Sequence, residues 1–240
     1  MMFEQIDCII NLTRVFFKPN VLVLGDSHAG VFRNKIFRRK LKSIAFKVVS
    51  VGGATVSGLK NPNSVTNAFE KYAAELRKYK GEVVVVMLGE VDTGFTIWFY
   101  AEKHGCNIDE SYSRAYENYK EFLLGIKANF ETVVISAPLP SIEDGDILGE
   151  IANLRKSVKS SQAERIQLTM KFNQEIEIFC LENDIFYLNL DADCLDVSGK
   201  IKKIYLNDDP KDHHYNQDAY ANLIASNLVG IPHFNLEGQE

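Results

Sequence analysis

Short apolar runs alternate with longer segments of helical periodicity along most of this chain. The runs are rich in Val and Ile and lie at residues 21–24, 46–51, 83–88, 132–136 and 185–190. The third begins with four consecutive valines, and the absence of polar alternation is typical of a strand buried on both faces of a parallel sheet. We therefore predict five strands, one for each run.

Longer amphipathic segments separate or follow these strands. Apolar side chains recur at helical spacing in residues 63–79, 110–130 and 161–183, and a last helix is predicted at residues 217–229. The first predicted apolar face includes Val65 and Phe69, and the third includes Met170 and Phe172. This alternation predicts an α/β fold, a three-layer α/β/α sandwich around a central five-stranded parallel sheet.

The length of 240 residues is compatible with one large domain that needs no disulfide or metal to fold. We expect a single domain over residues 1–240, with an N-terminal extension at 1–19. Residues 141–160 are the least regular stretch, and we interpret them as a surface excursion or a lid.

Charge and composition exclude several classes of function. The formal net charge of −5 argues against a protein that binds nucleic acid through its phosphates, and no apolar run is long enough to span a membrane. The N-terminus lacks the basic and continuous apolar regions of a signal peptide. The four cysteines show no CxxC spacing, so we expect a reduced, cytoplasmic protein without a disulfide framework or a metal site. The oligomeric state is left open.

The most informative segment is the end of the first predicted strand, where apolar residues lead into Gly25-Asp26-Ser27-His28. In an open parallel sheet, ligands bind beyond the carboxyl ends of the strands. A serine at the start of the helix that we expect there is well placed to act as a nucleophile, because free N–H groups stabilise the oxyanion that its attack creates. The alternative is that Asp26 and Ser27 are only helix caps.

Two further glycine-containing segments follow the second and third strands. One is Gly53-Ala54-Thr55-Val56-Ser57-Gly58-Leu59, and the other is Gly89-Glu90-Val91-Asp92. Together with Gly25-Asp26-Ser27, they resemble the first three conserved blocks of the SGNH/GDSL hydrolase superfamily. Two positions depart from the family pattern: His28 stands where the family has Leu, and Val91 stands where it has the Asn that donates to the oxyanion.

The last block of that family is an Asp-x-x-His motif before the final helix. The corresponding segment here is Asp209-Pro210-Lys211-Asp212-His213-His214, in which neither histidine has an aspartate three positions before it. We assign His214 as the base and Asp212 as the acid that orients it; His213 is the alternative base and Asp209 the alternative acid. The other interpretation is a solvated His-His loop or an adventitious metal site.

The resemblance implies a flavodoxin-like SGNH hydrolase fold and a serine esterase that needs no cofactor. Ser27 would be the nucleophile, and the N–H groups of Ser27 and Gly53 would form the oxyanion hole. The implied substrate is a small-molecule or glycan ester, and no long apolar tunnel is evident, which favours a small acyl group such as acetyl. Polar residues in the same blocks are candidates for substrate binding: Asp26, His28, Glu90 and Asp92.

Two alternatives keep the fold and change the activity. In one, the loss of Asn at position 91 leaves a catalytically weakened protein that binds a glycan or a partner protein. In the other, the same serine transfers its acyl group to a sugar acceptor instead of water.

Overall fold

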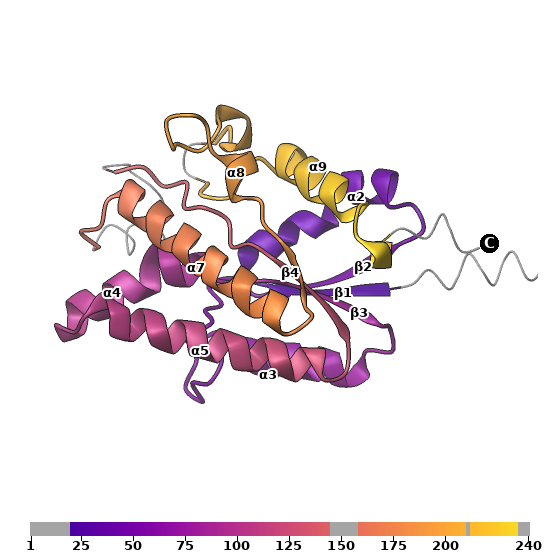
Figure 1. Ribbon diagram of the computed structural model, residues 1–240, viewed down its shortest axis with the longest axis horizontal. Helices are drawn as coiled ribbons and strands as arrows, with labels where there is room; N and C mark the ends of the chain where they lie inside the picture. The colour runs from indigo at the N-terminus through magenta and orange to yellow at the C-terminus, as the bar shows by residue number, and fades with distance from the viewer. Residues whose placement is uncertain (1–19, 145–157, 210–211, 235–240) are drawn as a thin grey trace, which may run out of the picture.

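A computed structural model describes residues 20–144, 158–209 and 212–234 of the chain (Figure 1). Its centre is a five-stranded, fully parallel sheet in the order β2-β1-β3-β4-β5. The strands are β1 (Asn20–Gly25), β2 (Ala45–Ser50), β3 (Val83–Met87), β4 (Glu131–Ile135) and β5 (Phe186–Leu188). This is the flavodoxin-like strand order, and all five strands lie within one or two residues of the predicted runs.

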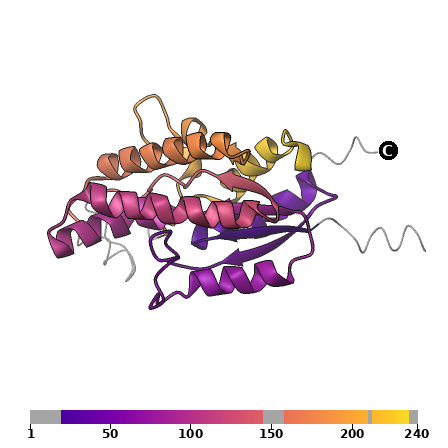
Figure 2. The same ribbon diagram turned by 60° about the horizontal axis from the view of Figure 1, so that its bottom comes forward.

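Helices cover both faces of the sheet, which confirms the predicted three-layer sandwich. In Figure 1, α2 (Lys35–Lys40) and α9 (Gln217–Leu228) lie above the sheet, whereas α3 (Ala68–Lys78), α5 (Ile108–Lys127) and α7 (Gln162–Glu182) lie below it or in front of it. Figure 2 shows the same layers with the lower face turned forward. The shorter helical segments are η1 (Ser27–Arg33), η2 (Asp92–Thr96), α4 (Ile97–His104), α8 (Asp191–Cys194), η3 (Lys203–Tyr205) and η4 (Pro232–Phe234).

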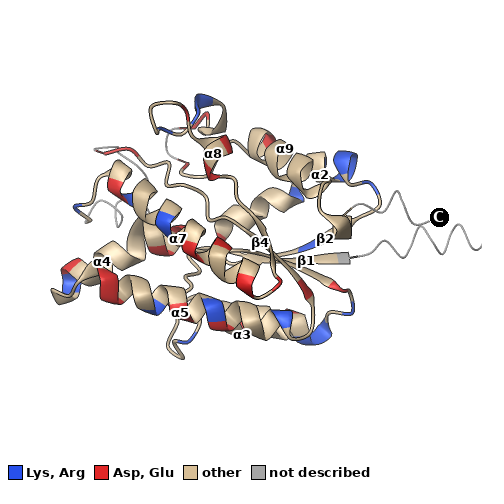
Figure 3. Cartoon of the chain, in the orientation of Figure 1, with Lys and Arg blue, Asp and Glu red and all other residues tan. Residues whose placement is uncertain are grey.

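Strands β1 and β3 divide their side chains between two apolar cores. Val21 and Val23 pack with η1, α2 and α9, whereas Leu22 and Leu24 pack with α3, α5 and α7. The valines of β3 alternate in the same way, so every side chain of that strand is buried. Neither strand contains a charged residue, and the charged positions in Figure 3 lie mainly on the outer helices and loops.

Two local expectations about the helices were wrong. The first long helix begins at Ala68 instead of residue 63, because Asn67 has a left-handed backbone with a φ of 48° that interrupts the turn before it. Val65 therefore lies outside the helix and is fully exposed. On α7, Met170 and Phe172 do not share one apolar face as expected. Met170 is exposed and Phe172 is buried, because residues two apart point to different sides of a helix.

The expected helix after Ser27 is also different in form. Residues 27–33 form the short 3₁₀ helix η1, and α2 follows after the cap residue Asn34. The predicted N-terminal extension at 1–19 and residues 145–157 of the predicted excursion lie outside the described residues. Among the described helices, none combines the length and the apolar character needed to cross a bilayer.

A buried amide and carboxyl pair fastens α7 to the carboxyl edge of the sheet. The side chain of Asn173 accepts a hydrogen bond from the N–H of Ala137 and donates to Ala137 O and to Asp191 Oδ1. Burial raises the pKa of Asp191 from 3.8 to about 7, and the nearby Glu177 adds to the shift, against the opposing effect of the hydrogen bond from Asn173. The fold therefore contains a carboxyl group that is costly to ionise.

This pair predicts a pH-dependent stability. Because the pKa of Asp191 is higher in the folded than in the unfolded chain, the folded protein binds the proton more tightly, and the free energy of unfolding falls as the pH rises from about 4 to about 7. The contribution lost is about 4 kcal/mol. We expect the free energy of unfolding of Asp191→Asn, minus that of wild type, to be larger at pH 8 than at pH 4.5. Urea unfolding followed by circular dichroism measures this difference. Asp193→Asn, at an exposed position, is the control; an unchanged pH profile in Asp191→Asn would contradict the assignment.

Candidate functional site

The site begins where β1 meets the carboxyl end of β3. A Cβ added to Gly25 would lie 2.3 Å from Met87 O and 2.6 Å from the Cβ of Ala29, so only glycine allows this close approach. The carbonyl of Gly25 also accepts hydrogen bonds from Val51 N and from the hydroxyl of Tyr72, at 2.9 and 2.8 Å. The backbone that leads to Ser27 is therefore held from β2, β3 and α3.

Asp26 is fully buried and caps η1. Its Oδ1 accepts hydrogen bonds from the backbone N–H of His28 at 2.9 Å and from His28 Nδ1 at 3.0 Å. Its Oδ2 is buried without a hydrogen-bond partner among the described residues. The capping role considered from sequence is thus present at Asp26, and the same carboxylate also orients an imidazole ring.

The loop before α9 supplies the second carboxylate and histidine pair. Asp212 Oδ1 lies 2.6 Å from His214 Nδ1 and accepts a hydrogen bond from the backbone N–H of His214 at 3.0 Å. Partial burial acts to raise the pKa of Asp212, but the hydrogen bonds from His214 outweigh it and hold that pKa below its ordinary value. An ionised carboxylate can only accept, so Nδ1 carries the proton and Nε2 of a neutral ring carries the lone pair.

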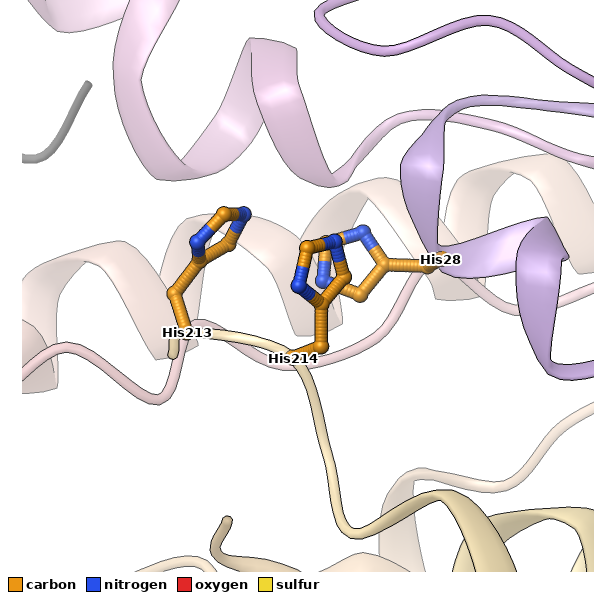
Figure 4. Close-up of side chains that lie close together, drawn as sticks. All are labelled: His28, His213 and His214. Carbon is orange, nitrogen blue, oxygen red and sulfur yellow. The ribbon is translucent and has the colours of Figure 1, made fainter. Parts of the chain in front are cut away.

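The two pairs face each other. The ring centroids of His28 and His214 are 4.8 Å apart, and that of His213 lies 4.1 Å from His214 and 5.6 Å from His28 (Figure 4). The turn after β1 and the loop before α9, which lie near opposite ends of the chain, therefore form one site. Ser27 is half-buried beside His28, and no hydrogen bond between described residues joins its hydroxyl to either His213 or His214.

The chain after β4 anchors the loop before α9. Buried Tyr215 donates a hydrogen bond from its hydroxyl to Leu139 O at 3.0 Å, and Ser141 Oγ donates to His213 O at 2.5 Å. These contacts come from the chain after β4, so the sheet fixes the position of both histidines. Asp209, the alternative acid, is exposed, and its backbone N–H donates to Asn207 Oδ1.

Asp92 holds the loop that follows β2. Its Oδ2 accepts from Val56 N at 2.7 Å, and its Oδ1 accepts from the N–H and the hydroxyl of Ser57 at 3.0 and 2.6 Å. Burial raises the pKa of Asp92 to about 6, although the hydrogen bonds from Ser57 and Val56 oppose this and the charge of Asp26 adds to it. With both oxygens engaged and no exposed surface, Asp92 supports the loop and does not face a ligand.

Gly53 lies in the same loop, with a φ of 69° and an exposed backbone. Its N–H makes no hydrogen bond to any described residue. Ser27 opens η1, so its N–H has no acceptor within the helix. Both predicted oxyanion donors therefore have unused N–H groups in the described part of the chain.

The third block is a buried, irregular helical turn. Glu90 is buried, with Oε2 at 3.8 Å from His28 Nδ1, and the π-helical turn η2 follows it. Val91 is buried too, and its side chain has no hydrogen to donate. The nearby hydroxyl of Thr93 is engaged within the fold, because it donates to Gly89 O and accepts from Thr169 Oγ1.

Sequence reasoning missed the joint position of His28 and Glu90. Both were candidates for substrate binding. In the structure both are buried, and the carboxylates of Asp26 and Glu90 lie beside the imidazole ring of His28. The repeated Asp-x-His spacing at Asp26-Ser27-His28 and Asp212-His213-His214 was the signal that could have revealed it.

A hollow of about 670 Å³ lies beside the loop that follows β2. It is lined from Gly58 to Glu70 and by residues of α5, and includes none of the predicted catalytic residues. The predicted catalytic residues therefore lie apart from the lining of this hollow.

Comparison with protein-family models and with curated protein sequences gave no match. Solved structures do match. A GDSL-like lipase from Bacteroides thetaiotaomicron is 17% identical with a TM-score of 0.56, over 88% of this chain and 88% of its own. An acetyl xylan esterase is 14% identical with a TM-score of 0.55, over 87% and 97%. A carbohydrate acetylesterase from Sinorhizobium meliloti is 14% identical with a TM-score of 0.54, over 89% and 100%.

The chain has the fold of the SGNH/GDSL hydrolases. The expected fold is thereby confirmed over 88–89% of this chain. In this SGNH fold, the first three blocks lie at the carboxyl ends of β1, β2 and β3, and the last block lies before α9.

The anchoring of the SGNH second block by Asp92 can be tested directly. Asp92→Ala leaves the amides of Val56 and Ser57 without their acceptor, at a cost of about 1–3 kcal/mol for each buried group. We expect hydrogen exchange at these two amides to accelerate about tenfold or more, since 1.4 kcal/mol corresponds to a factor of ~10. Ser57→Ala removes only the hydroxyl and should have a smaller effect. Equal protection in wild type and Asp92→Ala would show that the loop is held by other contacts.

Proposed function

We propose that this protein is a serine hydrolase of esterase type, with Ser27, His214 and Asp212 as its catalytic residues. The observation that supports this best is the hydrogen bond of 2.6 Å between Asp212 Oδ1 and His214 Nδ1, beside the turn that carries Ser27. The carboxylate sets the tautomer in which His214 Nε2 can accept a proton. Apo structures often show longer serine–histidine separations that tighten when substrate binds.

The reaction would proceed in two steps, acylation of Ser27 and hydrolysis of the acyl-enzyme. Ser27 Oγ attacks the ester carbonyl while His214 Nε2 takes its proton, and the tetrahedral intermediate collapses with transfer of that proton to the departing alcohol. Water then attacks the acyl-enzyme in the same way and releases the carboxylic acid and free Ser27. The N–H groups of Ser27 and Gly53 would donate to the oxyanion in both steps.

The substrate class we favour is a small acyl ester, such as an acetyl group on a carbohydrate. Two of the structurally similar proteins are an acetyl xylan esterase and a carbohydrate acetylesterase. The carboxylates beside the histidines, Asp26, Glu90 and Asp212, give the site a polar surrounding that agrees with a short acyl group.

Substitution of the proposed triad provides the first functional test. We expect Ser27→Ala and His214→Ala to lose hydrolysis of p-nitrophenyl acetate by about 10³-fold or more in kcat. Asp212→Asn should lose roughly 10²–10⁴-fold, because the amide no longer fixes the tautomer of His214. Asp209→Asn distinguishes the two candidate acids and should change the rate little.

The control for surface serines is Ser226→Ala, which lies on the exposed side of α9. If Asp209→Asn is slower than Asp212→Asn, Asp209 is the acid that orients the base. If Ser27→Ala is as active as wild type, the proposal of a serine nucleophile fails.

Val91 supports a second candidate function and a second test. A missing oxyanion donor costs about 2.7–4 kcal/mol of transition-state stabilisation, which favours a catalytically weakened protein that binds a glycan or a partner. We expect Val91→Asn to raise kcat for p-nitrophenyl acetate by ~10-fold or more, because it supplies a side-chain N–H in the third block. Val91→Leu has a similar volume without a donor and should give no increase. A folded Val91→Asn variant without any gain would show that the oxyanion site lies elsewhere.

A further inference from the structure

The three histidines of the site form a cluster that the esterase mechanism uses only in part. Potential ligand atoms of His28, His213 and His214 all lie within 4.8 Å of one another (Figure 4). They come from the turn after β1 and from two consecutive positions of the loop before α9. His28 is buried, and the other two are half-buried.

The two Asp-x-His segments present their rings in the same way. In both, one Oδ1 accepts from the backbone N–H of the histidine and lies at 3.0 Å or 2.6 Å from its Nδ1. Metal-binding histidines characteristically donate their second ring N–H to a carboxylate, which fixes the tautomer and the ring orientation. This contact thus directs metal binding to Nε2 of His28 and His214.

The charge around the cluster favours a cation. Asp26 and Glu90 are buried beside the ring of His28, and Asp212 lies beside that of His214. The only buried Lys or Arg among the described residues is Arg165, whose guanidinium donates to Ile142 O and lies near Asp144. The carboxylates beside the histidines thus add negative charge around the cluster.

We propose that His28, His213 and His214 bind one divalent transition-metal ion of the zinc type. Three imidazoles suit Zn²⁺, and three protein ligands leave a fourth position for water or an anionic ligand. Zn–N bonds of about 2.0–2.1 Å place tetrahedral ligand atoms roughly 3.3 Å apart. The potential ligand atoms, which lie within 4.8 Å of one another, would therefore have to approach by about 1.5 Å at most. This departs from our expectation from sequence, which was that the protein binds no metal.

The first test is direct metal binding by protein stripped with a chelator. We expect one Co²⁺ per chain, with the intense visible absorption of a tetrahedral Co²⁺ site, and displacement of the cobalt by Zn²⁺. His213→Gln, at a half-buried position, should weaken binding at least ~10-fold, and Asp212→Asn should weaken it ~10- to 100-fold. His28→Leu should abolish the tetrahedral absorption if its melting curve shows that it is folded.

The matched control is His104→Gln, which replaces an exposed histidine at the end of α4. It should bind Co²⁺ as wild type does. The proposal is overturned if wild type gives no tetrahedral spectrum, or if His213→Gln and His104→Gln bind with the affinity of wild type.

One consequence rests on the proposed function. His214 Nε2 cannot both bind the ion and accept the proton of Ser27, so Zn²⁺ should inhibit ester hydrolysis and a chelator should restore it. Cobalt binding is measured without any substrate, so an inactive esterase leaves the metal test intact. Full activity with the ion bound would contradict the sharing of His214.

Discussion

Burial of β1 and β3 on both faces is the constraint on which the site depends. Both strands must be apolar along their length, so the first polar side chains can appear only where the strands end. Parallel strands end at the same edge, and the close approach at Gly25 brings the end of β1 against the backbone of Met87. Asp26, Ser27 and His28 thus emerge beside Glu90 and Asp92 because of the sheet, not because of local sequence.

The cost of this arrangement is a group of buried carboxylates. Asp92 is compensated by three donors from the loop that contains Gly53, and Asp26 by two donors from His28. Each carboxylate therefore positions a different part of the site, since Asp92 holds a loop and Asp26 holds a ring. The same logic recurs at Asp212, which is more exposed and holds the ring of His214. The proposed triad and the proposed metal site both draw on these carboxylate–imidazole pairs.

Much of the fold could be predicted from the chain itself. The five strands and the long helices α5, α7 and α9 were apparent because their apolar periodicity extends over several turns or uninterrupted runs. The start of α3 could not be predicted, because the left-handed backbone of the single residue Asn67 does not change the apolar periodicity of the sequence. The helix α4 and the π-turn η2 follow a buried segment whose pattern is ambiguous between helix and loop.

The site was predictable in its parts and not in its assembly. Asp212 and His214 are two positions apart in the sequence, whereas the resemblance implies a spacing of three. Only the structure shows that Asp212 Oδ1 still contacts both the backbone N–H and Nδ1 of His214. The approach of His28 to His213 and His214 joins segments that are far apart in the chain, and no local pattern contains that information.

The most direct test of the account is whether Ser27 is an activated nucleophile. Intact-mass analysis after treatment with a fluorophosphonate, followed by peptide mapping, measures this without any assumption about the natural substrate. The account predicts a single adduct on Ser27 in the metal-free wild type and its loss in His214→Ala. Absence of an adduct, or an adduct on another serine, would contradict the proposal that the Asp212–His214 pair serves Ser27.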